Sequence, residues 1–255
     1  MSRCVILSAC PVQPELRRLL RSDDFIIACD AGYRNCARLG CKPDIIVGDF
    51  DSAPCPQQDT DDIVVLPHVK DDTDTEYAAK LAAQKGFDEV LLLGALGGKR
   101  VEHTLANLCT GLGLEQRGVR AALQDECSRI TFVLPGESRR YPKEEFFYFS
   151  TFPMEGRAEG VYEKGSFYEL EDAVLTAGYP LGVSNEYAEG TDCFQKSIRN
   201  LFFEFQCSCF MHSNRSLSNL NDYIICINAQ KNNRKFLRLF FCDFECIIFC
   251  YPAKL

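Results

Sequence analysis

The chain has 255 residues, enough to bury a sizeable core and to form one large domain or two modest ones. Its formal net charge is −8, so it lacks the overall positive field that proteins use to hold nucleic acid or an anionic membrane surface. No stretch is apolar for long enough to span a membrane. We therefore expect no nucleic acid and no membrane among its partners.

The cysteine content indicates a reducing compartment. The chain has 15 cysteines at irregular spacings and without a CxxC pair, which favours neither a disulfide framework nor a zinc site. We interpret them as free thiols and expect a cytoplasmic protein. Residues 7–10, LSAC, resemble a bacterial lipoprotein cleavage site, but the apolar run before them is too short and interrupted for a signal peptide. A buried first strand is the better interpretation.

Short apolar runs alternate with helix-period segments through residues 1–125. The predicted strands are Cys4–Ala9, Phe25–Cys29, Ile45–Val47, Ile63–Leu66 and Val90–Leu93. The predicted helices are Glu15–Arg21, Tyr33–Leu39, Thr75–Lys85 and Thr104–Gln116. Buried strands that alternate with helices predict an α/β domain, a Rossmann-like parallel sheet with helices on both faces.

The pattern changes near Gln124–Ser128. Strand-like runs separated by Gly and Pro turns predict a smaller β-sandwich over residues 126–190, with strands at Ile130–Leu134, Phe146–Phe149 and Phe167–Leu170. None of the chain's 17 glycines lies in residues 191–255, where roughly four or five would be average. We interpret this stretch as an atypical tail, from a frameshift, a read-through or a lineage-specific extension, which leaves the sandwich incomplete.

Paired carboxylates follow the third predicted strand. Residues Ile45–Val47 lead into Gly48, and Asp49 and Asp51 come next. Residues two apart in an extended segment point the same way, so both carboxylates would face one point at the carboxyl end of a parallel strand. Ligands bind at that end in open α/β sheets. The alternative is a loop with solvated acids and an Asx turn.

Another acidic cluster precedes the alanine-rich helix. Asp71, Asp72 and Asp74 lie within four positions. Thr73 and Glu76 match a capping box, and acids in the first turn of a helix favour its dipole. A capping box does not require three aspartates, however, and like charges this close repel one another.

The two acidic clusters would be stabilised by one shared divalent cation. Magnesium is a hard cation that proteins bind through one or two carboxylates, while its other positions hold water and substrate phosphates. The candidate ligands are the acids of the two clusters: Asp49 and Asp51, and Asp71, Asp72 and Asp74.

A glycine-rich stretch, GALGGKRVEHTLAN at residues 94–107, follows the fifth predicted strand and opens a helix. Its glycines would let backbone amides approach phosphate oxygens, and a helix start favours anions. Arg100 adds a guanidinium that binds phosphate through two parallel hydrogen bonds. The spacing matches neither a Walker A loop nor GxGxxG, and a bare glycine turn is the alternative. Asp30 and Gly32 follow another strand and would lie at the same edge.

As a set, these motifs resemble the bacterial thiamine pyrophosphokinase (thiamine diphosphokinase) family. They are DAG at 30–32, PDIIVGDFDS at 43–52, KDDTDTEYA at 70–78 and GALGGKRVEHTLANL at 94–108, with GYPLGVSNEY at 178–187 similar to a late GVSNEF-type segment. The resemblance covers roughly residues 1–190. It implies transfer of a diphosphoryl group from the co-substrate ATP to thiamine, by a homodimer with an α/β catalytic domain, a β-sandwich and a thiamine site where the subunits meet.

The resemblance also implies roles for single residues. The catalytic set would be Asp49, Asp51, Asp71, Asp74 and Arg100, with the four aspartates as magnesium ligands. The nucleotide would be bound by Asp30, Gly32, Ser52, Thr73, Gly97, Gly98, His103 and Asn107. Ser184 and Asn185 would line the thiamine pocket. Family members usually carry GGRxDH, whereas in this chain Lys99 intervenes and Glu102 replaces the aspartate.

Two other functions stay open at this point. The DxD at 49–51 resembles the nucleophile loop of aspartate-based phosphohydrolases, in which Asp49 would form a phosphoaspartate. Those enzymes usually place the motif near the start of the chain, and the later motifs would be unexplained. A non-catalytic nucleotide- or thiamine-binding protein is the second alternative, because the GGKRVEH stretch and the tail depart from the family pattern.

Overall fold

The computed structural model describes residues 2–50, 62–67, 71–142, 146, 148–188, 193–196, 202–207, 227–231, 234–241 and 244–247. The chain divides into two compact units, Met1–Phe210 and Met211–Leu255. In the second unit an antiparallel sheet consists of β15 (Ile227–Lys231), β16 (Arg234–Phe241) and β17 (Phe244–Ile247). Within the described ranges no helix has the length and apolar character that a membrane crossing requires.

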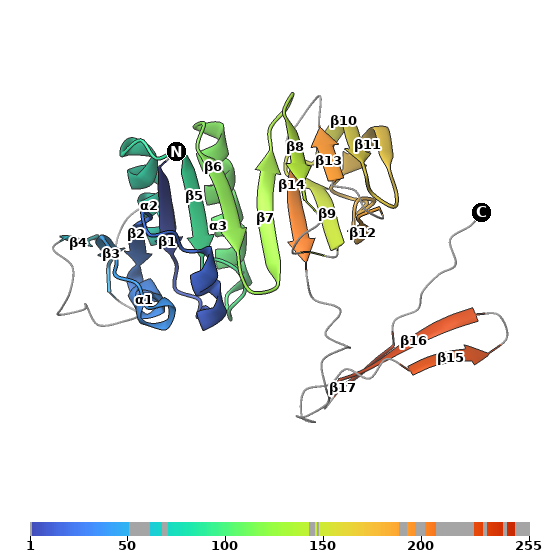
Figure 1. The fold of residues 1–255 in the computed structure, drawn as a ribbon, viewed down its shortest axis with the longest axis horizontal. Coiled ribbons are helices and arrows are strands. Elements are labelled where there is room, and N and C mark those ends of the chain that lie inside the picture. Colours follow the sequence, from blue (N-terminus) through green and yellow to red (C-terminus); the bar gives the residue numbers. More distant parts are fainter. Residues whose placement is uncertain are drawn as a thin grey trace. The chain divides into compact units, whose positions relative to one another are not determined.

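Six parallel strands form one half of a 10-stranded sheet in the first unit (Figure 1). They are β1 (Arg3–Leu7), β2 (Phe25–Cys29), β3 (Ile45–Gly48), β4 (Asp62–Val65), β5 (Glu89–Leu93) and β6 (Arg120–Gln124). Their spatial order is β4-β3-β2-β1-β5-β6. The order reverses between β1 and β5, so the carboxyl ends of these two strands form a topological switch point, where open α/β sheets bind ligands.

Helices cover both faces of this parallel sheet. The helical elements are η1 (Pro14–Leu19), η2 (Asp30–Gly32), α1 (Tyr33–Leu39), α2 (Asp74–Gln84) and α3 (Val101–Gln116). Side chains of β1 alternate between the faces: Ile6 packs in the cluster that contains α2 and α3, and Leu7 packs in the one that contains η1 and α1. The predicted α/β fold with helices on both faces is confirmed.

Two local predictions differ from the structure. The helix predicted at Glu15–Arg21 is the short 3₁₀ helix η1, in which Leu16 is the only buried side chain. One buried position provides no apolar stripe to hold an amphipathic α-helix against the sheet. The strand predicted at Phe167–Leu170 begins only at its last residue, and the two aromatic residues before it lie exposed in a turn.

The sheet continues past β6 into the β-rich half of the unit. Strand β6 pairs antiparallel with β7 (Ser128–Val133), and the order then runs β7-β14-β9-β12. These added strands are β9 (Tyr148–Pro153), β12 (Asn185–Glu186) and β14 (Phe202–Cys207). A 4-stranded sheet of order β11-β10-β13-β8 consists of β8 (Ser138–Tyr141), β10 (Arg157–Lys164), β11 (Leu170–Thr176) and β13 (Cys193–Lys196). Phe149, Val161 and Leu175 from the two sheets share one core, as in a sandwich.

Strands β13 and β14 lie beyond residue 190, where the sequence analysis ends the sandwich. Strand β13 lies between β10 and β8, and β14 lies between β7 and β9, so both fill interior positions. Gln195 and Gln206 are buried, and the Gln206 amide donates to the Tyr187 hydroxyl at 2.7 Å. The β-rich half therefore extends to at least Cys207. The prediction that the sandwich ends near residue 190 without its final strands was wrong.

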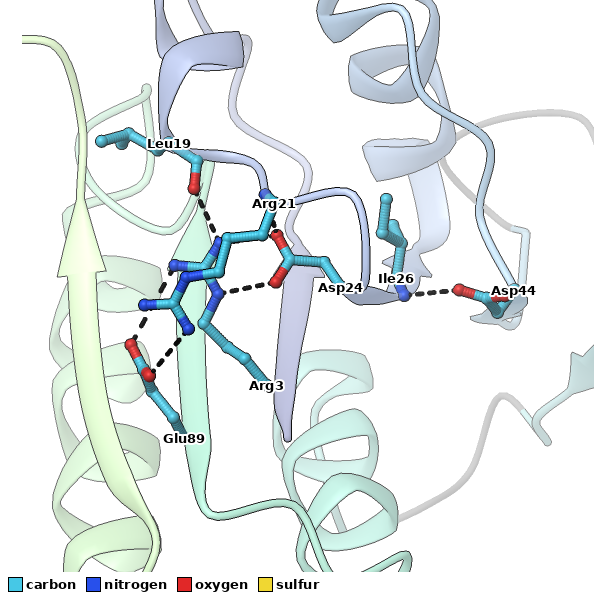
Figure 2. Close-up of polar contacts among 7 residues, drawn as sticks. All are labelled: Arg3, Leu19, Arg21, Asp24, Ile26, Asp44 and Glu89. Carbon is cyan, nitrogen blue, oxygen red and sulfur yellow. Dashed lines mark hydrogen bonds and ion pairs between the residues drawn. The ribbon is translucent and has the colours of Figure 1, made fainter. Parts of the chain in front are cut away.

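A cluster of charged side chains closes the amino edge of the parallel sheet (Figure 2). Arg3 donates from Nε and Nη2 to the Asp24 carboxylate at 2.7 and 2.6 Å, and from Nη2 to the Leu19 carbonyl at 2.7 Å. Glu89 lies 3.2 Å from Nη1 of Arg21. The Arg3 and Asp24 side chains are only 8% and 1% exposed, so they form a buried ion pair.

Asp24→Ala is expected to destabilise the fold by about 3–5 kcal/mol, because it leaves the Arg3 guanidinium buried without its carboxylate. Arg21→Ala is the matched control: its pair with Glu89 is 49% and 25% exposed, so its loss should cost about 1 kcal/mol or less. Urea unfolding followed by circular dichroism measures both. Equal losses in the two variants would contradict the role given to the buried pair.

Candidate functional site

The carboxyl ends of four strands bring most of the predicted motifs to one edge of the sheet. The segments that follow β1, β2, β3 and β5 begin at Ser8, Asp30, Asp49 and Gly94, respectively. The Ser8 amide donates to the Leu93 carbonyl at 2.8 Å, and the Cys10 amide donates to the Gly94 carbonyl at 3.0 Å. These bonds join the first and the glycine-rich segments directly at the topological switch point.

Glycines allow η2 to pack between the ends of neighbouring strands. A Cβ on Gly32 would lie 1.9 Å from the Leu7 carbonyl oxygen, and one on Gly48 would lie 3.1 Å from Cα of Asp30. Asp30 has a φ of 46° and is buried, and its Oδ1 has no hydrogen-bond partner within the described residues. A buried carboxylate oxygen without a donor is costly, so Asp30 fits a site that a cation or a donor group completes.

Asp49 directly follows β3 and is half-buried at this edge. Its neighbour Phe50 adopts a φ of 55° and packs against the core on the α1 face. Asp51 and Ser52 lie outside the described residues. The expected convergence of Asp49 and Asp51 on one point therefore stays a prediction.

Helix α2 begins at the same edge. The buried hydroxyls of Ser8 and Thr75 lie 3.0 Å apart. The Cys29 thiol lies 3.6 Å from the backbone carbonyl of Asp74, and burial raises the pKa of that thiol well above its ordinary value. These contacts seat Asp74 beside the ends of β1 and β2, at the edge that also carries Asp49.

The acidic cluster before α2 divides into different roles. Thr73 caps the helix, because its hydroxyl accepts the Glu76 amide at 3.1 Å. Asp72 accepts from the Lys80 ammonium at 2.6 and 2.8 Å, so a neighbouring lysine answers its charge. Asp71 lies exposed on the edge. The capping alternative thus explains Thr73 and not all three aspartates.

The glycine-rich segment is held by side chains of α3. Gly97 and Gly98 have φ values of 74° and 82°, which favour glycine. The Thr104 hydroxyl accepts from the Gly97 amide at 3.1 Å, and the Asn107 amide donates to the Ala95 carbonyl at 2.7 Å. Asn107, predicted as a nucleotide contact, therefore fixes the backbone that would approach phosphate.

Arg100 lies at the start of α3. Its Nε donates to Oε1 of Glu102 at 2.7 Å, and this contact holds the pKa of Glu102 below its ordinary value. The two side chains are 69% and 60% exposed, so the pair is weak enough to exchange for a phosphate. Arg100, the N-cap residue of α3, makes no side-chain capping bond among the described residues, so amides at this helix start are available to anions. The His103 amide donates to the Arg100 carbonyl at 3.1 Å, and His103 itself lies exposed.

The donors at this edge are of the type that magnesium prefers. Asp30, Asp49 and Asp74 supply carboxylate oxygens, which are hard ligands. Among the described residues no group of three His, Cys, Asp or Glu side chains is arranged to hold a metal ion. Asp51, one of the predicted ligands, lies outside that part of the chain. The fit to magnesium therefore depends on donor chemistry and on the unpartnered oxygen of Asp30.

The predicted thiamine-side residues lie in the β-rich half. Ser184 is exposed, has a φ of 56°, and donates its amide to the Ser150 hydroxyl at 2.9 Å. Asn185 is buried next to it. Close by, the rings of Phe167 and Tyr168 meet edge to face at 4.9 Å and are 68% and 66% exposed. The sequence analysis missed this pair because it predicted a strand at Phe167–Leu170. In a strand, adjacent side chains point to opposite faces, so only one of the two rings would be exposed.

Asn35 is another residue that the sequence analysis missed. It is fully buried, and its amide donates to the carbonyls of Ser8 and Cys10 at 2.8 and 2.9 Å. It thereby holds the segment after β1, which includes Ser8 and Cys10. In the sequence analysis this segment was considered only for its resemblance to a lipoprotein cleavage site. The rule that identified Asp30, a polar residue directly after a buried strand, does not reach Asn35, because Asn35 lies on helix α1.

A cleft of about 840 Å³ lies elsewhere in the unit and is lined by none of the predicted site residues. It includes Arg120, the first residue of β6, so it opens at the amino edge of the sheet. Its wall residue Arg139 lies 2.7 Å from the Glu115 carboxylate and 3.5 Å from that of Glu137. Glu115 and Glu137 thus neutralise the charge of this arginine. The cleft is not the predicted site, because none of the predicted site residues lines it.

Comparisons with protein families identify both halves of the first unit. A family model described as "Thiamin pyrophosphokinase, catalytic domain" matches residues 16–123, and one described as "Thiamin pyrophosphokinase, vitamin B1 binding domain" matches residues 140–195. The thiamine pyrophosphokinase of Bacillus subtilis (strain 168) is 28% identical over 192 residues, which cover 72% of this chain and 89% of that protein.

Solved structures of the same name share the fold. The crystal structure of thiamine pyrophosphokinase from Bacillus subtilis has a TM-score of 0.73 at 21% identity and covers 82% of this chain and 100% of its own. The enzyme from Geobacillus thermodenitrificans has a TM-score of 0.71 at 25% identity, with coverages of 82% and 98%. Thiamin pyrophosphokinase from Candida albicans has a TM-score of 0.67 at 13% identity, with coverages of 81% and 89%.

Gly32→Ala is expected to destabilise the chain by more than about 3 kcal/mol, the upper end of ordinary overpacking, because the added Cβ meets a backbone oxygen that cannot rotate away. Gly178→Ala is the control, since a Cβ there meets nothing within 4 Å. Chemical unfolding of the two variants measures the difference. If Gly32→Ala unfolds together with the wild type, the close packing of η2 under β1 is refuted.

Proposed function

The chain belongs to the thiamine pyrophosphokinase family, and on this premise we propose that it transfers the diphosphoryl group of ATP to the hydroxyl of thiamine, giving thiamine diphosphate and AMP. The observation that carries the proposal is the switch point, where the segments after β1 and β5 join at the edge that also holds Asp30, Asp49 and Asp74. ATP as co-substrate and the free thiols of Cys4, Cys10, Cys29, Cys36, Cys41 and Cys109 support a cytoplasmic enzyme.

The polyphosphate of ATP lies, in this proposal, along the carboxyl edge of the sheet. The backbone of Gly97 and Gly98 and the first amides of α3 face its oxygens, and Arg100 exchanges Glu102 for a phosphate. Asp30 and Gly32 supply the nucleotide side of the same edge, together with Ser52 and His103. Thr73 and Asn107 contribute indirectly, by capping α2 and by holding the glycine-rich segment.

Magnesium would be held by Asp49, Asp51, Asp71 and Asp74. When bound, the ion neutralises the charge of the polyphosphate and aligns it for attack. Asp72 is excluded from this set because its carboxylate already pairs with Lys80. The protein's own contribution is to hold oxygen ligands at one edge, with α2 fixed there by the Ser8–Thr75 hydrogen bond.

In the reaction, the hydroxyl oxygen of thiamine forms a bond to the β-phosphorus of ATP. The bond between that phosphorus and the oxygen shared with the α-phosphorus breaks, and AMP leaves with the electron pair. Asp71 or Asp74 accepts the hydroxyl proton. Apart from this proton transfer, catalysis of this kind depends on positioning and charge neutralisation, which the edge supplies.

Thiamine would bind beside Ser184, and a second copy of the chain would complete its site. Exposed apolar side chains gather in the same part of the β-rich half: Phe167, Tyr168, Val174, Tyr179, Leu181 and Val183. Contiguous exposed apolar residues are typical of protein–protein interfaces. A homodimer built on these residues would place a second subunit beside the thiamine side of the first.

The two alternative functions are not favoured. A phosphohydrolase that uses Asp49 as nucleophile leaves the vitamin B1 binding domain at residues 140–195 without a role. Incubation of the chain with ATP, magnesium and thiamine, followed by assays for AMP and thiamine diphosphate, tests all three functions. A trapped phosphoenzyme would support the hydrolase, and tight binding without AMP would support a non-catalytic protein.

Asp49→Asn is expected to lower kcat by about 100-fold or more, the scale seen when one group that stabilises transition-state charge is removed, while the unfolding midpoint stays near that of the wild type. Asp23→Asn, the same change at an exposed position before β2, is the control and should keep full activity. AMP release measures both variants. Wild-type turnover in Asp49→Asn would refute the metal assignment.

Leu181→Glu is expected to convert the proposed homodimer to monomers and to abolish thiamine turnover, because it places a charge in the apolar patch. Leu105→Glu is the matched control, since Leu105 is also exposed but lies on α3 outside the patch. Sedimentation equilibrium reports the oligomeric state. A monomeric wild type, or an unchanged dimer in the Leu181 variant, would contradict this interface.

A further inference from the structure

The core of the β-sandwich contains a fully buried carboxylate that the proposed reaction does not use. Glu163 of β10 is 0% exposed, and burial raises the pKa of its carboxyl. It accepts hydrogen bonds from the Thr151 hydroxyl at 2.5 Å, the Asn185 amide at 3.1 Å and the Gln195 amide at 3.3 Å. Among the described residues no lysine or arginine pairs with it, so these neutral donors compensate its burial.

The hydrogen bonds of Asn185 are all made within the protein. An amide side chain offers two N–H donors and a carbonyl oxygen with two lone pairs. Nδ2 donates to Glu163 and, at 2.8 Å, to the Tyr168 carbonyl, while Oδ1 accepts the amides of Tyr168 and Glu186, both at 3.0 Å. The side chain is only 5% exposed. Asn185 therefore has no free donor or acceptor for a substrate.

These bonds clamp two segments together. Asn185 binds the backbone of Tyr168 through both its N–H and its carbonyl, and the Phe167 amide donates to the Glu186 carbonyl at 2.8 Å. The clamp sets the direction in which the exposed Phe167 and Tyr168 rings and the neighbouring Ser184 face solvent. Glu163 fixes the orientation of the Asn185 side-chain amide by accepting its N–H from the core of the sandwich.

We infer that Glu163 and Asn185 are a pair of positioning residues, which hold the thiamine-side surface in shape without touching thiamine. The inference rests on the proposed function for its substrate, and on the hydrogen bonds above for its geometry. The resemblance implies that Asn185 lines the thiamine pocket, and in this inference it acts there through the backbone at residues 166–168 and 184–186.

Glu163→Leu removes the acceptor for Asn185 and is expected to raise KM for thiamine about tenfold, equivalent to about 1.4 kcal/mol of binding. KM for ATP and kcat should stay within about twofold, because loss of uniform substrate binding changes KM alone. Glu163→Gln is the conservative variant, because its amide oxygen can face Asn185. Among the described residues the buried Oε1 of Gln195 lacks a partner, so it can accept the new N–H. This variant should restore most of the affinity for thiamine.

Tyr141→Phe is the control for a lost buried hydrogen bond. The hydroxyls of Tyr141 and Thr131 lie 3.1 Å apart, and neither residue belongs to the clamp. Its KM for thiamine should not change. If Glu163→Leu does not fold, Thr151→Val, which removes one donor at similar volume, should raise KM for thiamine about threefold. A folded Glu163→Leu or Thr151→Val variant with the wild-type KM, or one in which kcat or KM for ATP changes instead, overturns the inference.

Hydrogen exchange separates the inference from the proposed function. In Glu163→Leu the amides of Phe167 and Tyr168 should exchange at least about tenfold faster, with the exchange of β1 unchanged. If the wild type releases no AMP from ATP and thiamine, the proposed function fails, and faster exchange still supports the clamp. Unchanged exchange at both amides overturns the clamp whatever the activity.

Discussion

The antiparallel pairing of β6 with β7 is the constraint on which the rest of the first unit depends. Ala122 faces Thr131 and Leu123 faces Ile130 in this ladder, and β7 then pairs with β14. One sheet therefore runs from the parallel strands into the sandwich (Figure 1), without a flexible linker between the two halves. Backbone hydrogen bonds carry the twist of one half into the other, so the edge that holds Asp30 and the surface that holds Ser184 keep one relation within each chain.

The distribution of charge explains why the acidic edge is tolerated in the folded chain. Arg3 and Asp24 balance each other at the amino edge, and Lys80 balances Asp72 beside the carboxyl edge. Among the described residues, the buried Oδ1 of Asp30 lacks a hydrogen-bond partner, at the switch point where a ligand would arrive. Charges at the amino edge and beside α2 are thus paired within the chain, whereas the Asp30 oxygen is left for a ligand.

The sequence predicted the α/β half well, because buried strands and amphipathic helices have different hydrophobic periods; Phe25–Cys29 and Tyr33–Leu39 match to the residue. The motif positions at the carboxyl edge followed from the same topology. The strands that complete the sandwich were missed, because glycine content says nothing about pairing between distant segments. It could not be predicted either that all hydrogen-bonding groups of the Asn185 side chain are occupied. This depends on Glu163 and Tyr168, which approach Asn185 only in the folded chain.

The contact between Gly98 and Cys10 has a practical consequence. A Cβ on Gly98 would lie 2.7 Å from Sγ of Cys10, so a group that contacts this face of the glycine also covers that sulfur. Burial raises the pKa of the half-buried Cys10 thiol, so at any given pH less of it is thiolate than for an exposed cysteine. The rate at which iodoacetamide alkylates Cys10, followed by mass spectrometry, would therefore serve as a footprint of occupancy in the unmodified enzyme.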